Sequence, residues 1–145
     1  MTNTVLITVC GTQTMDGESE SIKTVQPGIH RSLPDMEVVL YEESISDENS
    51  HIINTTKNII KIQDAQITVI KKGATQTEMH FEKGHTCHGF YKTPFGVFDM
   101  TIRTSALEVT QTEKRMDLSI QYALELNGMA VSDCTMKIRI EPDTK

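Results

Sequence analysis

The fold is decided by residues 116–126, MDLSIQYALEL, in which every even position is apolar and most odd positions are polar. A period of two over this length indicates a β-strand with one buried face, because successive side chains of a strand point to opposite sides. Residues 134–140, CTMKIRI, are again apolar at the even positions. We therefore expect the two stretches to pair with both apolar faces on one core.

The turn between these strands sets their register. A two-residue loop would pair even positions with odd ones and put the apolar faces on opposite sides of the sheet. A three-residue loop at 126–128 pairs Leu118 with Met136 and Ile120 with Cys134 instead. We predict the three-residue loop, whose last residue, a glycine, tolerates the left-handed conformation.

Further breaks of this kind punctuate the chain and predict a series of antiparallel hairpins. They are Met15-Asp16-Gly17, Lys71-Lys72-Gly73, Glu82-Lys83-Gly84 and Pro94-Phe95-Gly96. The same parity argument predicts pairs between facing strands, and these are Ile67 with Thr77, Val69 with Thr75, Phe81 with His85, Met79 with Cys87 and Phe90 with Met100. In these pairs odd positions face inward up to Cys87 and even positions face inward from Phe90, so the inward face has to change between them. Gly89 is the expected bulge.

No long helix is expected, and about ten strands account for the chain. The remaining strands are predicted at Val5–Thr14, Glu18–Gln26, Met36–Ser44 and Ile52–Gln63, with longer connections at Pro27–Asp35 and Ser46–Ser50. We predict a single all-β domain over residues 1–145, an antiparallel up-and-down barrel, because closure removes exposed edges. Two packed sheets are the alternative, and the interior of a barrel could be hollow or filled by side chains.

Charge argues against a nucleic-acid partner. The chain has 14 basic and 20 acidic residues, and residues 1–56 hold 9 of the acids but only 2 of the bases. An acidic surface repels phosphate backbones. No apolar run is long enough for a membrane helix and no signal segment is visible. The three cysteines show no metal-type spacing and suit a reducing compartment, so we expect a cytoplasmic protein.

Several motifs resemble the YwiB-like family of bacterial proteins over nearly the whole chain. They are Lys71-Lys72-Gly73, Phe81-Glu82-Lys83-Gly84, Tyr91-Lys92-Thr93-Pro94-Phe95-Gly96, Tyr41-Glu42-Glu43 and Gly11-Thr12-Gln13. The resemblance implies a calycin-like β-barrel, similar in shape to lipocalins and fatty-acid-binding proteins, and no established biochemical activity. The chain contains no Trp, so the Gly-x-Trp signature of lipocalins is missing.

A metal site is conceivable on the hairpin that carries His80 and His88. The predicted register pairs Glu78 with His88 and makes His80 their diagonal neighbour, so that three ligands would converge on one face. The alternative, which we favour, is an ordinary solvated outer face. No metal or other cofactor is therefore expected.

A polar anchor for a ligand is expected near Tyr41 and Glu43. Glu42 and Glu43 diverge on a strand, so they cannot form an acid/base pair, but one of them should point toward the interior. A buried carboxylate needs a partner, and Arg103 and Tyr122 are the ones to test. A purely structural pair at the mouth of the barrel is the alternative.

We found no Gly-x-Ser-x-Gly elbow, no Cys with a co-facial His, and no phosphate-binding loop, so an enzyme is not the favoured reading. A Tyr, Glu or His with a strongly shifted pKa in a cleft would revive it.

Two functions remain. The first is a barrel that binds a small amphipathic ligand, with an interior lined by Leu118, Ile120, Tyr122 and Met136 and the polar end held by Tyr41, Glu43 or Arg103. The second is a filled barrel that docks another protein through the acidic region 35–50 or through an edge strand. A second copy of the chain is also a partner to test, whereas membranes are not expected.

Overall fold

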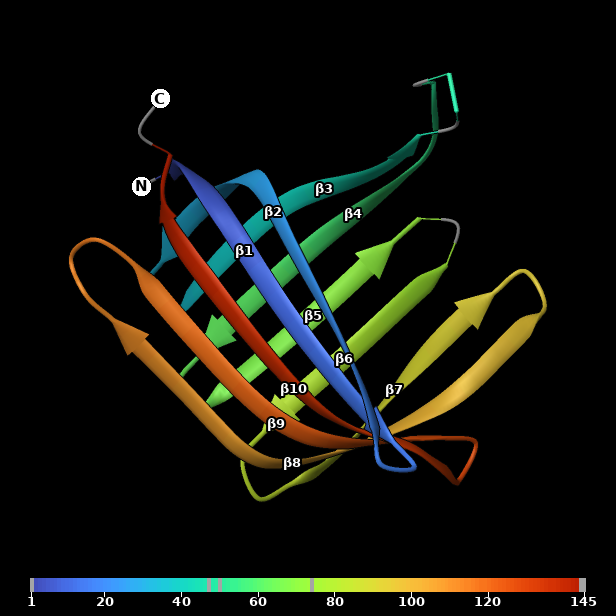
Figure 1. Ribbon diagram of the computed structural model, residues 1–145. Helices are drawn as coiled ribbons and strands as arrows, with labels where there is room; N and C mark the ends of the chain where they lie inside the picture. Colours follow the sequence, from blue (N-terminus) through green and yellow to red (C-terminus); the bar gives the residue numbers. More distant parts are fainter. Residues whose placement is uncertain (1, 47, 50, 74, 144–145) are drawn as a thin grey trace.

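The computed structural model describes residues 2–46, 48–49, 51–73 and 75–143, and for residues 2, 45–46 and 52–54 it describes the backbone alone (Figure 1). Ten antiparallel strands close into a barrel in which each strand pairs with the next along the chain and β1 pairs with β10. The all-β barrel of about ten strands is therefore confirmed. The strands are β1 (Thr2–Met15), β2 (Glu18–Leu33), β3 (Met36–Ser46), β4 (Ile52–Gln63), β5 (Gln66–Lys72), β6 (Gln76–Glu82), β7 (Thr86–Thr93), β8 (Gly96–Gln111), β9 (Met116–Leu126) and β10 (Met129–Pro142).

The apolar face of β9 lies inside the barrel, as its alternation predicts. Leu118 is 2% exposed and Ile120 is fully buried, and Ile138 and other even residues of β10 are buried with them. The ring of Tyr122 meets the ring of Phe81 from β6 edge-on, with 4.9 Å between the centroids. Side chains therefore fill the barrel at this level.

A two-residue turn joins β9 to β10, so the predicted three-residue loop is wrong. Asn127 and Gly128 both have positive φ, 50° and 81°, and Leu126 pairs with Met129 across them. Such turns suit the twist of a hairpin, and both central residues then occupy the left-handed region. Val131 is left out of the ladder as a bulge, which returns the even positions of both strands to one face.

Other predicted registers have the right parity but are displaced along the strands. The observed pairs are Leu118 with Ile138, Ile120 with Met136, Ile67 with Phe81 and Val69 with Met79. Between β5 and β6 the displacement arises because Gly73 follows the last residue of β5 and begins the loop instead of ending it. The β6–β7 ladder is short, pairing Gln76–Glu78 with Phe90–Lys92, so the predicted pairs of Met79 and Phe81 with β7 are wrong.

The odd-numbered residues of β7 face inward along the whole strand, so the predicted change of face at Gly89 is also wrong. The turn to β8 is the two-residue Pro94-Phe95, and Tyr91 rather than Phe90 packs against the core. Gly89 serves a different need, because a Cβ there would strike the carbonyl oxygen of Glu78 on β6. The glycine lets two backbones approach closely without re-aiming the strand.

The strand β2 runs unbroken through the predicted connection at Pro27–Asp35, which is therefore wrong; only Pro34-Asp35 forms the turn. β2 pairs with β1 almost throughout, but with β3 only from Gly28 onward. The next pair would place Pro27 opposite Glu42, and proline has no N–H to donate to the ladder. Beyond this point the β1–β2 hairpin runs to the lower right of Figure 1, while β3 and β4 run to the upper right.

No helix in the described part of the chain is long and apolar enough to cross a membrane.

Candidate functional site

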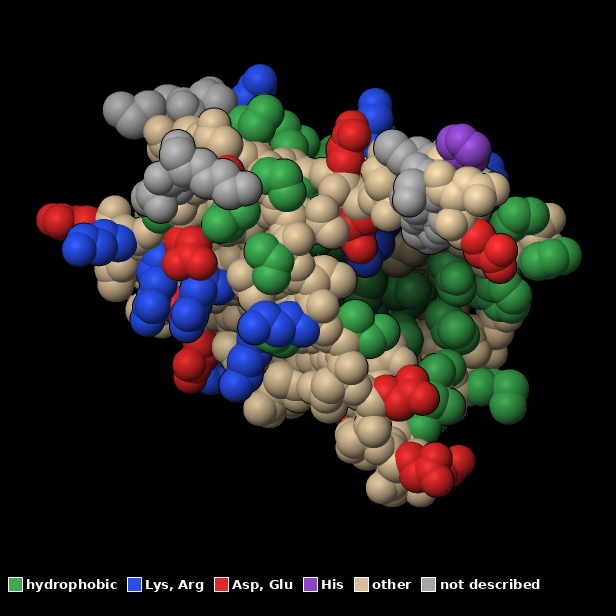
Figure 2. All heavy atoms as spheres, turned by 45° about the horizontal axis from the view of Figure 1, so that its top comes forward, with side chains coloured by type: hydrophobic (Ala, Val, Ile, Leu, Met, Phe, Trp, Pro, Cys, Tyr) green, Lys and Arg blue, Asp and Glu red, His purple; other side chains and the backbone are tan. Residues whose placement is uncertain are grey.

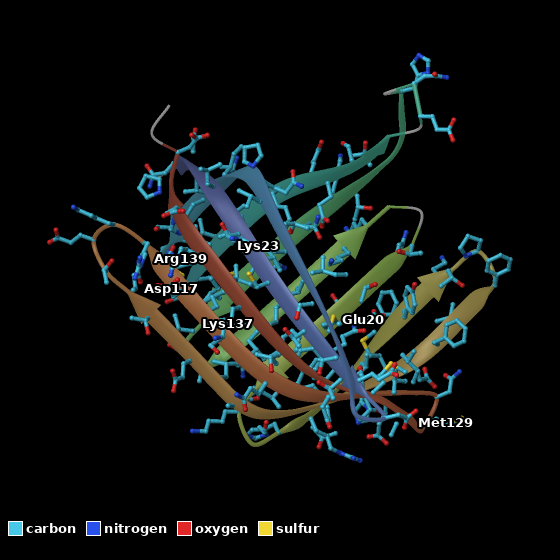
Figure 3. All side chains as sticks on the ribbon, in the orientation of Figure 1. Glu20, Lys23, Asp117, Met129, Lys137 and Arg139 are labelled. Carbon is cyan, nitrogen blue, oxygen red and sulfur yellow. The ribbon has the colours of Figure 1, made fainter. Side chains whose placement is uncertain are left out.

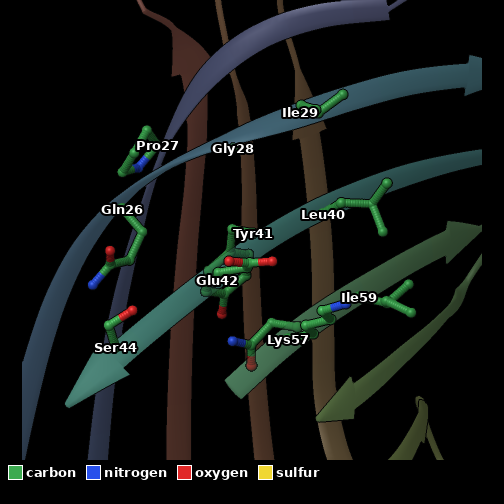
Figure 4. Close-up of a pocket in the computed structure, with 11 residues that line it drawn as sticks. Gln26, Pro27, Gly28, Ile29, Leu40, Tyr41, Glu42, Ser44, Lys57 and Ile59 are labelled. Carbon is green, nitrogen blue, oxygen red and sulfur yellow. The ribbon is translucent and has the colours of Figure 1, made fainter. Parts of the chain in front are cut away.

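The separation of β2 from β3 leaves a groove of about 700 Å³ in the barrel wall, which we call the β2–β3 groove (Figure 4). Strands β2, β3 and β4 supply its lining. The residues are Gln26, Pro27, Gly28, Ile29, Leu40, Tyr41, Glu42, Ser44, Lys57, Asn58 and Ile59. Because the gap passes through the wall, side chains from both the inner and the outer face of the sheet line one groove.

The outer part of the groove divides into an apolar half and a polar half. Ile29, Leu40 and Ile59 are direct neighbours across β2, β3 and β4 and form an apolar row. Two residues further along, Glu42 on β3 faces Lys57 on β4. Figure 4 shows Leu40 and Ile59 on one side of the groove and Gln26 and Ser44 on the other. The groove is thus amphipathic along its length.

Asn58 is the buried polar residue of the groove, with 1% of its surface exposed. Its side-chain Nδ2 donates to Oε1 of Glu43 at 3.0 Å and to the carbonyl oxygen of Thr56 at 3.4 Å. The carboxylate of Glu43 fixes the amide orientation, because only the NH₂ end can donate to it. The other end, Oδ1, is buried and accepts no hydrogen bond from any described residue. A buried acceptor without a donor is costly, by about 1–3 kcal/mol.

Glu43 also lies close to a cation on the same, inner side of the sheet. The Nζ of Lys71 on β5 is 3.9 Å from Oε1 of Glu43, and both side chains are partly exposed. Solvent screens such a pair, so it contributes little to stability. The expectation that one of the two adjacent carboxylates points inward is met by Glu43, while Glu42 lies on the outer side.

Tyr41 lines the groove and faces inward on β3. Burial raises the pKa of its phenol above the ordinary value, and the nearby charge of Glu43 raises it further. A raised pKa keeps the hydroxyl protonated, so Tyr41 can donate a hydrogen bond but is a poor base. Tyr41 is thus a tyrosine with a shifted pKa that lines a groove, and its protonated phenol is available there as a hydrogen-bond donor.

The other interior residues singled out from the sequence belong to the packed core. Leu118, Ile120 and Tyr122 are buried, and Met136 is half-buried against them. The pKa of Tyr122 is raised by burial and by Cys134. Figure 2 shows a hollow bordered by hydrophobic side chains on one face of the molecule, so the barrel is not filled to its surface everywhere.

Arg103 does not reach the interior, so its predicted place inside the barrel beside Tyr41 is wrong. Its guanidinium is well exposed and lies 2.9 Å from the carboxylate of Glu125 on β9. Its neighbour Ile102 is fully buried, and adjacent residues of a strand face opposite sides. Arg103 therefore sits on the outer face.

The three residues of the conceivable metal site are not brought together. Glu78 pairs with Phe90 instead of His88. His80 lies 3.6 Å from Glu78, whereas Nδ1 of His88 is 3.5 Å from Thr101 on β8. Among the described residues, no three His, Cys, Asp or Glu side chains are arranged to hold a metal ion.

Sequence reasoning missed most of the groove because it read residues 27–35 as a loop. The signal was present in Pro27-Gly28, a pair that normally ends a strand. Here Pro27 ends only the ladder with β3. Gly28 allows β3 to pass close by, since a Cβ would strike the carbonyl oxygen of Leu40 and the side chain of Ile7.

Comparisons with known proteins agree with this fold. A family model described as "Domain of unknown function (DUF1934)" matches residues 7–138. The chain is 22% identical over 111 residues to the uncharacterized β-barrel protein YwiB of Bacillus subtilis, covering 77% of this chain and 74% of that one. The crystal structure of the B. subtilis YwiB protein superposes with a TM-score of 0.79 at 20% identity, over 99% of this chain and 94% of the other. The resemblance to YwiB-like proteins is confirmed.

Proposed function

The chain belongs to the DUF1934 family, and we propose that it is a non-enzymatic barrel that binds a small amphipathic molecule in the β2–β3 groove. The size and lining of the groove carry this proposal. Small-molecule sites typically enclose about 300–1,000 Å³ and combine apolar walls with a few polar groups. The groove, at about 700 Å³, has that size and that combination.

The lining suggests how such a ligand would lie. Its apolar part would cover the row formed by Ile29, Leu40 and Ile59, which offers no polar side chain. Its polar end would reach toward Tyr41 and Asn58, where a phenol can donate and an amide oxygen lacks a donor. We therefore propose a ligand whose polar end both donates and accepts hydrogen bonds.

This proposal moves the ligand from the centre of the barrel to its wall. Leu118 and Ile120 are packed against other core side chains, which argues against a ligand placed among them. A ligand there would have to displace packed apolar groups, which costs on the order of 1–3 kcal/mol even for a small overfilling. The groove needs no such rearrangement.

Two measurements test the proposal. Native mass spectrometry of the purified protein, repeated after denaturation, should reveal a bound molecule as extra mass that is lost on denaturation. Titration with the fluorescent amphiphile N-phenyl-1-naphthylamine should give saturable binding to the purified protein. In Leu40→Trp a large ring fills the groove, so we expect the affinity for this probe to fall at least about tenfold, equivalent to about 1.4 kcal/mol.

Val109→Trp is the matched control. Val109 is an exposed apolar residue of β8 that does not line the groove, so this substitution adds the same ring elsewhere. The probe should bind this variant as it binds the unaltered protein. Equal affinity for Leu40→Trp and the unaltered protein would refute the groove as the site.

A protein-interaction module is the second candidate, favoured by the packed centre of the barrel. The acidic residues of region 35–50, Glu42 among them, would meet a basic partner. A poly-lysine peptide is a simple probe, and its affinity should drop steeply between about 50 mM and 300 mM salt as the charges are screened. A flat response to salt would exclude this surface.

We also propose a cytoplasmic location, which the three cysteines support. Cys10, Cys87 and Cys134 are all free thiols. Unpaired cysteines are usual where the compartment is reducing.

A further inference from the structure

One side of β2 is an open strand edge from Glu18 to Gln26, which we call the free edge. These residues pair with β1, but their ladder with β3 begins only at Gly28. Within the described part of the chain, no other strand pairs with them and no backbone hydrogen bond from a turn or loop reaches them. The closed barrel thus still presents unpaired backbone groups along this part of β2.

The turn at Asp16-Gly17 determines which backbone groups are free. Met15 and Glu18 flank this two-residue turn, so they form a hydrogen-bonded pair, and every second residue of β2 from Glu18 bonds to β1. The alternate residues turn their N–H and C=O groups toward the free edge. These are Ser19, Ser21, Lys23 and Val25.

Two large apolar side chains of the free edge are exposed to solvent. Ile22 is 70% exposed and Val25 is 52% exposed. Glu20 and Lys23 both project from this part of β2 (Figure 3). Proteins usually blunt exposed edges with short strands, charges or proline, because such an edge is a template for another strand. Within the free edge these devices are the charges of Glu18, Glu20 and Lys23, and the backbone groups between them stay unpaired.

We propose that the free edge pairs with the free edge of a second copy of this chain, antiparallel and across a two-fold axis at Ile22. The edge is self-complementary about that residue, since Ile22 is the midpoint of Glu18–Gln26. An axis perpendicular to the sheet keeps equivalent faces together, so the facing residues are even with even and odd with odd. The facing pairs are Ile22 with Ile22, Glu20 with Thr24, Glu18 with Gln26, Ser21 with Lys23 and Ser19 with Val25.

Both backbone and side chains fit this register. The hydrogen-bonded pairs are Ser21 with Lys23 and Ser19 with Val25, which are the residues with free N–H and C=O groups. Ile22 then occupies a non-hydrogen-bonded pair, where facing side chains are closest, so the two exposed isoleucines cover each other. The pairing ends where Pro27 of one copy would meet Gly17 in the turn of the other.

Charges argue against the neighbouring registers. A shift in one direction sets Lys23 against Lys23, and a larger shift in the other direction sets Glu20 against Glu20; like charges directly opposite are destabilising. A smaller shift in that second direction places Glu20 opposite Ile22, and this register pairs fewer residues than the proposed one. Like charges therefore disfavour two of these three registers and the smaller number of paired residues disfavours the third, which leaves one closed dimer rather than open-ended pairing.

The dimer and the groove adjoin. Gln26, the last residue of the free edge, lines the β2–β3 groove, and in the dimer it faces Glu18 of the second copy. An interface of one strand pair is small, so we expect a weak, concentration-dependent dimer.

Sedimentation velocity and light scattering on the whole chain, from about 1 μM to about 1 mM, test the proposal over the range expected for a weak interface. The average mass should rise from one chain toward two. Ser21→Pro should abolish this rise, because it removes an N–H that points to the second copy and leaves the ladder with β1 intact. Ile22→Lys should abolish it independently, by setting two cations face to face.

Ser21→Ala and Ile22→Val are the matched controls, since both keep the backbone donor and an uncharged side chain, and both should dimerise like the unaltered protein. Circular dichroism should show all four variants folded. Amide hydrogen exchange should slow with concentration at Ser19, Ser21, Lys23 and Val25. A mass of one chain at every concentration would overturn the proposal, and so would a dimer that survives both Ser21→Pro and Ile22→Lys.

Discussion

Replacing Gly28 by alanine should destabilise the barrel, whereas the same change at Gly11 should stabilise it. Both glycines lie in strands and neither has positive φ, so a methyl group is compatible with each backbone. They differ in their surroundings. A Cβ at Gly28 would strike the carbonyl oxygen of Leu40 and the Cδ1 of Ile7, while a Cβ at Gly11 would meet nothing within 4 Å.

The sign of each effect follows from two opposing terms. Alanine has fewer conformations than glycine in the unfolded chain, which stabilises the folded state by about 0.4–1 kcal/mol. Overpacking costs about 1–3 kcal/mol, and at Gly28 the obstacle includes β3 backbone that cannot rotate away. The net change at Gly28 is a loss of about 0.5–2 kcal/mol. At about 3 °C per kcal/mol, the expected Tm falls by about 2–6 °C for Gly28→Ala and rises by about 1–3 °C for Gly11→Ala.

Thermal unfolding followed by circular dichroism, with urea unfolding at 25 °C as a second measure, gives both values. A Gly28→Ala variant as stable as the unaltered protein would contradict this reasoning. It would mean that β2 and β3 do not approach each other closely at Gly28, and the geometry of the groove would have to be revised.

Three further outcomes are expected. Pro27→Val supplies the N–H missing opposite Glu42, so the β2–β3 ladder should lengthen. The new amide of residue 27 should then exchange slowly, and the narrowed groove should bind the probe more weakly. Tyr41→Phe should make the protein lose less stability at alkaline pH. Because the folded pKa of Tyr41 is raised, its contribution to the free energy of unfolding is complete below the ordinary pKa of about 10 and is lost as the pH rises further. Urea unfolding at pH 9 and at pH 11 measures this difference. Phe81→Ala should cost about 3–5 kcal/mol in urea unfolding, since this ring is 1% exposed and packs on Tyr122.

The alternation in β9 could be read correctly because it depends on one strand alone. Leu118 and Ile120 face the core whatever their partners are, since burial selects the apolar face of a strand. Their partners could not be read, because the turn used two residues and Val131 then bulged. Nothing in the type of residue at 131 marks a bulge. The predicted pairing of even positions with even positions was still right, because the core requires the apolar faces of both strands to lie on the same side.

The candidate site shows where local rules and the fold disagree. Pro27-Gly28 has the composition of a loop, yet β1 holds both residues in a strand and only the ladder with β3 is interrupted. That interruption makes the groove, so the strongest local signal was assigned to the wrong structure. Arg103 is a simpler error, because inward Ile102 already implied that its neighbour points outward.

The pairing of β1 with β10 has a consequence for how the chain is made. Residues 2–15 leave the ribosome long before residues 129–142 are translated, and at about 5–20 residues per second the delay is roughly 6–25 s. During that time the hairpins from β1 to β9 can form, but together they make only a curved, open sheet whose edge strands, β1 and β9, are both unpaired on one side. β10 turns this sheet into a barrel, so a ribosome that stalls before β10 would leave an open sheet that is still prone to aggregate.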